Sequence, residues 1–283
     1  MKSAVCLVVR NEARDIAEWI AFHALLGFDT QIILDNESED GTADIIKSAS
    51  AFADIRYHSW PDRTARSQLA AYDAACTAYK AEFDWMAFID SDEFIVLEAA
   101  ESINSFLARF DGWSGIGLHW AMYGSSGHDD FPPGLVVENF CRRADADFFP
   151  ARHIKSVIRP QLTERCVNPH FFDLLPGPRG TYCNAVGEAL EWWPTPEHGG
   201  TLRGLSAAPP VYAGARLNHY FTRSRAHFLA KIRRGYPSDT AVRKAEEFEA
   251  YDRNEVHDPA AMRFGEALRK ASDMIKRKAG LLF

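Results

Sequence analysis

The chain has 283 residues, of which 47% are hydrophobic and 12% aromatic, enough for a packed core and too many for a disordered protein. Its formal net charge of −7 argues against a general nucleic-acid-binding protein, which would normally be basic. Residues 215–283, in contrast, contain 15 Lys and Arg against 9 Asp and Glu. This basic portion suits phosphates, an anionic acceptor or a membrane surface.

The first third of the chain alternates apolar runs with helical patterns. Apolar runs at residues 4–9, 31–34, 55–57 and 84–89 predict strands. The spacing of apolar residues predicts helices over 13–26, from 43 onward and over 64–81, and Gly27 is placed to end the first of them. Such alternation predicts an α/β fold in which helices flank a mostly parallel, Rossmann-like sheet.

Beyond about residue 98 the pattern is less regular. Residues 102–110 predict a helix, residues 115–120 a strand, and residues 123–134 a polar, glycine-rich loop. Residues 168–214 are rich in Pro, Gly and aromatic residues, which predicts long loops over a site rather than a second core. Charged helices are predicted over 222–234 and 241–252.

The predicted last helix, over residues 259–279, is amphipathic. Its apolar stripe consists of Phe264, Leu268, Ala271 and Ile275. We expect this stripe to pack on the core, and a peripheral membrane contact is the alternative.

The cysteines and the start of the chain predict a cytoplasmic protein, with the inner face of the membrane as the alternative location. The five cysteines are scattered and show no Cys-x-x-Cys spacing, which is typical of a reducing compartment. The apolar run at residues 4–9 is followed at once by Arg10 and is too short for a signal peptide or a membrane span.

Three polar clusters follow predicted strands: Arg10-Asn11-Glu12, Asp35-Asn36 and Asp90-Ser91-Asp92. Ligands of such sheets bind beyond the carboxyl ends of the strands, so the clusters are predicted to meet at one site. Two aspartates two residues apart point the same way at a strand end, and close like charges need a cation. Their oxygen atoms suit Mn²⁺ or Mg²⁺.

The order and spacing of these motifs resemble the glycosyltransferase family 2 pattern on a GT-A fold. More narrowly, the chain resembles the branch in which Asp-x-Asp is followed by Glu-Phe, related to the family 92 galactosyltransferases. The resemblance is specific over residues 4–95, continues in patches to 236 and is absent beyond about 240. The patches are Trp120 to His128, Lys155-Ser156-Val157 and Asn218-His219-Tyr220.

The resemblance implies a GT-A-like domain over residues 1–236, followed by a C-terminal helical extension over 237–283. Within the domain, residues 1–98 form the nucleotide-sugar-binding half. Residues 99–236 form the acceptor-side half, with irregular loops.

The resemblance also implies roles in donor binding. Asp92 is the expected direct metal ligand, with His219 and with Asp90, which binds the cation through water or accepts from the ribose. The remaining expected donor contacts are Arg10, Asn11, Glu12, Asp35, Asn36, Gln68, Ser91, Lys155, Lys231 and Arg234. The alternatives are a helix N-cap for Asn11-Glu12 and a solvated helix face for Lys231 and Arg234.

An inverting transferase needs a general base for the acceptor hydroxyl. The candidates are Asp130, Glu138 and His128, of which Asp130 is favoured because Phe131 could desolvate it. Glu93 is expected to support the metal or the acceptor, and a solvated turn is its alternative. Aromatic side chains that line the acceptor pocket, or else belong to the core, are His170, Trp120, Trp192 and Trp193.

The sequence therefore predicts a metal-dependent glycosyltransferase. It would move a hexose from a nucleoside diphosphate sugar, expected to be UDP-linked, to a glycan or lipid-linked acceptor with inversion. A metal-dependent phosphohydrolase or phosphotransferase with Asp90 as nucleophile is the enzymatic alternative. The non-enzymatic alternative is a carbohydrate-binding module on the same fold.

Overall fold

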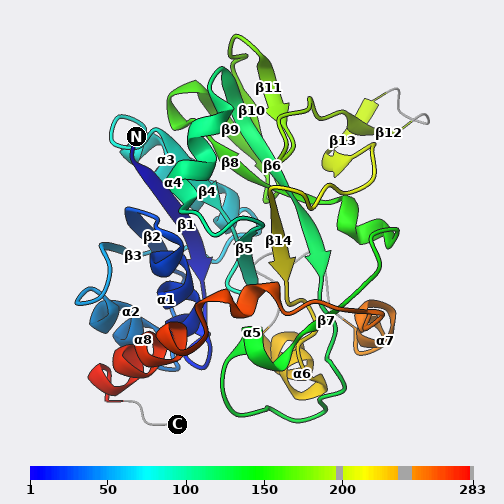
Figure 1. Ribbon diagram of the computed structural model, residues 1–283. Helices are drawn as coiled ribbons and strands as arrows, with labels where there is room; N and C mark the ends of the chain where they lie inside the picture. The colour runs from blue at the N-terminus through cyan, green and yellow to red at the C-terminus, as the bar shows by residue number, and fades with distance from the viewer. Residues whose placement is uncertain (196–199, 235–243, 281–283) are drawn as a thin grey trace.

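The computed structural model describes residues 1–195, 200–234 and 244–280 of the chain. Figure 1 shows a central sheet with helices on both of its faces. Within the described residues, nine strands form this sheet in the order β3-β2-β1-β4-β8-β6-β14-β5, with β11 beside β6. The strands are β1 Ser3–Val9, β2 Thr30–Asp35, β3 Ile55–Ser59, β4 Trp85–Phe88, β5 Glu93–Leu97, β6 Trp113–Met122, β8 Ile154–Ile158, β11 Gly180–Cys183 and β14 Ala215–His219.

The sheet is mostly parallel, which confirms the predicted fold class. The pairs β1–β2, β2–β3, β1–β4, β6–β14 and β6–β11 are parallel. The pairs β4–β8, β6–β8 and β5–β14 are antiparallel. The antiparallel strand β8 lies between the group β3-β2-β1-β4 and the group β6-β14-β5, and it pairs with both β4 and β6.

Each face of the sheet carries its own hydrophobic cluster. Val5 and Leu7 of β1 face a cluster that contains buried residues of α1 (Ile16–Leu26), α2 (Thr42–Ala49) and α8 (Gly265–Lys278). Ala4 and Cys6 face the other cluster, to which α3 (Ser67–Tyr79) contributes. Side chains alternate along a strand, so β1 buries both of its faces and reads as a continuous apolar run.

The first third of the chain folds as its pattern predicts. Helix α1 ends at Gly27, whose φ of 98° is the left-handed conformation that glycine adopts readily. Gly41, with φ 90°, precedes α2 in the same way, and the Asp40 side chain accepts from the amide of Thr42 at 3.1 Å.

The prediction of long loops over residues 168–214 is wrong. Antiparallel ribbons form from β9 (Thr163–Asn168) with β10 (Phe171–Leu174) and from β12 (Trp192–Thr195) with β13 (Gly200–Ser206), while β11 joins the main sheet. These strands are short and several of their residues are only partly buried, so Pro and Gly obscured the alternation.

The strands β5 and β8 were also missed by the sequence analysis, although both are buried throughout. The remaining helices are α4 (Ile103–Leu107), α5 (Val136–Asn139), α6 (Arg225–Arg234) and α7 (Glu247–Tyr251). Helix α6 begins three residues later than predicted, because Arg223 has a left-handed φ of 50°. The start of the helix predicted over 241–252 lies outside the described residues.

The described part of the C-terminal extension packs on the domain. Leu268, Ala271 and Ile275 of α8 are buried in the cluster that contains α1, which confirms that the apolar stripe packs on the core. A short strand, β15 (Val256–His257), pairs with β7 (Arg142–Arg143). The division of the chain at residue 236 stays a prediction. Within the described ranges, no helix combines the length and the apolar character needed to cross a membrane.

We expect Ile275→Ala to lower the free energy of unfolding by about 2–4 kcal/mol, because it leaves a cavity beneath α8. Ile275 is 1% exposed, whereas Met274 on the same helix is 47% exposed. Met274→Ala is therefore the matched control and should change stability by less than about 0.5 kcal/mol. Urea denaturation measures both, and equal effects of the two variants would contradict docking of α8 on the core.

Candidate functional site

The carboxyl ends of β1 and β4 border a cavity of about 400 Å³. Asn11 and Glu12 line it from the end of β1, and Asp92 lines it from the loop after β4. Arg223, which precedes α6, and Lys231 of α6 line the opposite wall. The cavity therefore lies where a parallel sheet binds its ligands, and both acidic and basic side chains face it.

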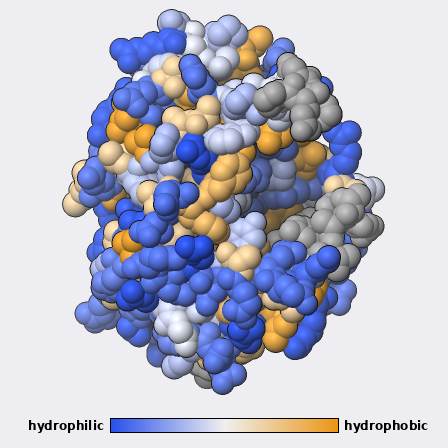
Figure 2. Space-filling view, turned by 90° about the vertical axis from the view of Figure 1, so that its right-hand side faces the viewer, coloured by the Kyte–Doolittle hydropathy of each residue, from blue (hydrophilic) through white to orange (hydrophobic). Residues whose placement is uncertain are grey.

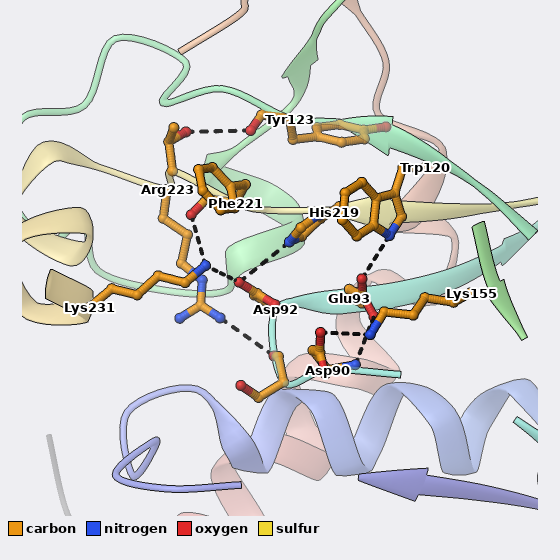
Figure 3. Close-up of polar contacts among 12 residues, drawn as sticks. Asp90, Asp92, Glu93, Trp120, Tyr123, Lys155, His219, Phe221, Arg223 and Lys231 are labelled. Atoms are coloured by element: carbon orange, nitrogen blue, oxygen red, sulfur yellow. Dashed lines mark hydrogen bonds and ion pairs between the residues drawn. The ribbon is translucent and has the colours of Figure 1, made fainter. Parts of the chain in front are cut away.

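The two aspartates after β4 are each held by a different lysine (Figure 3). The Nζ of Lys155, on β8, is 2.7 Å from Asp90 Oδ2, and Gln68 Nε2 donates to Asp90 Oδ1 at 2.8 Å. Lys231 Nζ donates to Asp92 Oδ2. The like charges predicted from the sequence are thus compensated by ammonium groups from β8 and α6.

The Asp92 side chain is buried, and it also contacts His219, the last residue of β14. His219 Nε2 lies 3.6 Å from Asp92 Oδ2. Burial raises the pKa of Asp92, but Lys231 and His219 outweigh it and hold the pKa well below its usual range. Burial lowers the pKa of His219 despite the neighbouring carboxylate, and its Nδ1 is buried without a hydrogen-bond partner.

Glu93 is completely buried, so the alternative of a solvated turn is wrong. Its Oε2 accepts from the backbone amide of Asp90 at 2.7 Å and lies 3.5 Å from Lys155 Nζ. Its Oε1 accepts from the indole N–H of Trp120 at 2.7 Å. Burial raises the pKa of Glu93 to about 8, against the opposing effect of Lys155. Glu93 therefore fixes the loop after β4 and the ring of Trp120 together.

Asn11 and Glu12 hold the loop that follows β2. Asn11 Oδ1 accepts from the amide of Glu39 at 2.8 Å, and Asn11 itself has a left-handed φ of 52°. The amide of Glu12 donates to Thr42 Oγ1 at 2.8 Å. Arg10, in contrast, is half-buried, and its Nε is buried without a partner.

Asp35 and Asn36 also connect loops to the sheet. Asp35 accepts from the hydroxyl of Tyr57 at 3.0 Å, and the side-chain amide of Asn36 donates to the carbonyls of Trp60 and Asp62 at 2.9 and 2.6 Å. Both side chains are buried. Their predicted contacts with a nucleoside stay a prediction.

The sequence analysis missed Arg223, whose buried guanidinium joins three parts of the site. It donates to Asp15, lies 3.5 Å from Glu12 Oε2 and donates to the carbonyl of Ser91 at 3.4 Å. Burial opposes its positive charge, but the surrounding carboxylates raise the pKa of Arg223. The sequence did contain one indication of such a residue. Glu12 and Asp15 lie just before α1, and acids that are buried need a basic partner.

The three candidate bases lie apart from one another. Glu138 forms two hydrogen bonds with Arg269 of α8, at 2.7 and 2.8 Å. Asp130 is exposed, so the expected desolvation of its carboxylate by Phe131 is wrong. The ring of His128 packs edge-on against Phe140. Within the residues that the structure describes, no group of three His, Cys, Asp or Glu side chains is arranged to hold a metal. The metal ligands and the base stay predictions, and the side chain of Arg234 lies outside the described part.

The model of glycosyltransferase family 92 matches residues 2–199 of the chain. The chain belongs to glycosyltransferase family 92. It is 32% identical over 188 residues to a family 92 protein of Arabidopsis thaliana, a match that covers 61% of this chain and 32% of that protein. A family 92 protein of Oryza sativa subsp. japonica is 31% identical over 192 residues, covering 66% of this chain and 31% of that protein. The chain thus spans about a third of the length of these curated relatives. The resemblance seen in its motifs is confirmed.

Solved structures with a similar chain course include S. aureus TarS 1-349 in complex with UDP. It is 17% identical, with a TM-score of 0.40, covering 57% of this chain and 48% of that chain. The mannosyltransferase Ktr4p from S. cerevisiae in complex with GDP is 15% identical, with a TM-score of 0.28, covering 44% of this chain and 41% of that chain.

We expect Lys155→Met to destabilise the fold by about 3–5 kcal/mol, because it leaves the buried carboxylate of Glu93 and the side chain of Asp90 without their cation. Lys270→Met removes an exposed ion pair with Glu266 and should cost less than about 1 kcal/mol. Urea denaturation of both variants tests this difference. A loss for Lys155→Met as small as that of the control would show that the lysine does not compensate these acids.

Proposed function

We propose that this chain is a metal-dependent glycosyltransferase that moves a hexose from a UDP-sugar to a glycan or lipid-linked acceptor with inversion. The observation that carries the proposal is the buried carboxylate of Asp92, which lines the cavity between Lys231, Arg223 and His219. A nucleoside diphosphate leaving group gains negative charge during transfer, so it needs cations at this position. Membership of family 92 supports the same reaction class.

A divalent cation would bind where acidic side chains gather. Glu12, Asp15 and Asp92 line the cavity, and Asp90 lies two residues before Asp92. Mg²⁺ and Mn²⁺ are commonly bound by one or two protein ligands, with substrate phosphates and water completing the shell. Asp92 and His219 would hold the ion directly and Asp90 through water. Bound there, it would neutralise charge on the departing diphosphate.

The side chains around the cavity suit the rest of the donor. Lys231 and Arg223 provide positive charge for the phosphates, as lysine and arginine commonly do. Phe131 lines the cavity, and its aromatic ring could contact a base or a sugar. The guanidinium of Arg14 lies over this ring, 4.2 Å from its centroid. We assign Asn11 and Glu12, at the end of β1, to the nucleoside.

The phosphohydrolase alternative is less well supported, because a nucleophilic carboxylate needs an open oxygen. Oδ1 of Asp90 accepts from Gln68, and Oδ2 is paired with Lys155.

All five cysteines are free, which supports our proposal of a cytoplasmic location. The basic face of α8 supports a location at the inner membrane surface for a lipid-linked acceptor.

We expect Asp92→Asn to abolish hexose transfer and Mn²⁺-dependent binding of UDP while the fold is retained. The amide removes the charge that attracts the cation, but it keeps the shape of the side chain. Asp111→Asn is the control, since the Asp111 side chain is 99% exposed and lies outside the cavity lining. Isothermal titration of UDP with Mn²⁺ and with EDTA measures binding, and unchanged affinity in Asp92→Asn would exclude the metal assignment.

A further inference from the structure

His170 lies in the turn between β9 and β10, and four separate contacts fix its position. Its amide donates to Asn168 Oδ1 at 2.8 Å, and its carbonyl accepts from Ser156 Oγ at 2.7 Å. Its ring Nδ1 is 3.0 Å from the carbonyl of Ile154. Gly204 of β13, with φ 90°, packs so closely that a Cβ there would lie 2.6 Å from the Cβ of His170.

The contact with Ile154 fixes the tautomer of the imidazole. A carbonyl oxygen only accepts hydrogen bonds, so Nδ1 carries the proton and Nε2 carries the lone pair. Burial, and next the charge of Lys155, lower the pKa of His170 well below its ordinary value, so the ring is neutral near pH 7. A neutral ring held through Nδ1–H can accept a proton at Nε2, and the carbonyl then stabilises the imidazolium.

His170 belongs to the side of the site that faces away from the phosphate-binding cations. Its ring lies 5.0 Å from that of Trp120, which in turn lies 4.3 Å from the ring of His219. Figure 3 shows Lys231 and Arg223 on the opposite side of Asp92 from Trp120. The face that carries β12, β13 and α7 on the right of Figure 1 is hollowed near its middle (Figure 2).

We propose that His170 is the general base of the transfer reaction, an inference that rests on the proposed function. As the acceptor oxygen bonds to C1 of the donor sugar, the hydroxyl proton passes to His170 Nε2. The bond from C1 to the diphosphate oxygen breaks, and its electron pair leaves with the nucleoside diphosphate. The imidazolium then returns the proton to water.

The test compares His170→Ala and His170→Asn with the native protein. Asparagine keeps a donor for the carbonyl of Ile154, so it guards against loss of the fold. The donors are UDP-hexoses with Mn²⁺, and the acceptors are p-nitrophenyl glycosides and 4-nitrophenol. We expect kcat with the glycosides to fall by about 10²–10⁴-fold in both variants while the Kd of UDP stays within about twofold. Free imidazole should restore part of the activity of His170→Ala.

The two acceptor types and a neighbouring histidine separate the possible outcomes. 4-Nitrophenol is a much stronger acid than a sugar hydroxyl and is partly ionised near neutral pH, so its transfer depends less on a base and should fall far less. His153→Ala removes a ring 5.2 Å from that of His170 and should lose less than about tenfold, without imidazole rescue. Native kcat in both His170 variants, or equal losses with both acceptor types, would overturn the assignment. If the native protein transfers sugar from no donor, the proposed function fails and this inference fails with it.

Discussion

The structure depends on compensating the charge of three acids that follow β4. Asp92 and Glu93 are buried and Asp90 is partly buried, and burial of an unpaired carboxylate is costly. Their cations come from β8 and α6, more than sixty residues along the chain, so the ion pairs join the first third of the chain to its later parts. In the function proposed above, Lys231 would both compensate the charge of Asp92 and contact the phosphates of the donor.

How much of this could be predicted from the sequence depends on the range of the contacts. The strands β1, β2 and β4 contain continuous apolar runs, and Gly27 and Gly41 mark helix boundaries through local backbone conformation. These features act within a few residues, so local patterns reveal them. The position of the three polar clusters at one edge of the sheet follows from the same alternation.

The parts that could not be predicted depend on distant partners. Nothing local to Lys155 indicates that it is buried against Asp90, because a lysine within an apolar strand becomes stable there only when its carboxylate partner arrives. Arg223 is specified by acids more than two hundred residues earlier. Glu93 was expected at a loop, although the apolar residues Phe94 to Leu97 behind it favour a buried strand. The ribbons β9–β10 and β12–β13 expose part of their surface, so apolar and polar residues do not alternate regularly enough along them to predict strands.

Glu93 determines how the two sides of the site are spaced. One of its oxygens accepts from the amide of Asp90 in the loop after β4, and the other accepts from the indole of Trp120 on β6. A carboxylate has a fixed separation between its oxygens, so it sets the distance between the loop after β4 and the β6 strand that carries Trp120. Trp120 in turn contacts the rings of His219 and His170. His219, which would bind the cation, and His170, which would take the proton, are therefore both positioned through the buried side chain of Glu93.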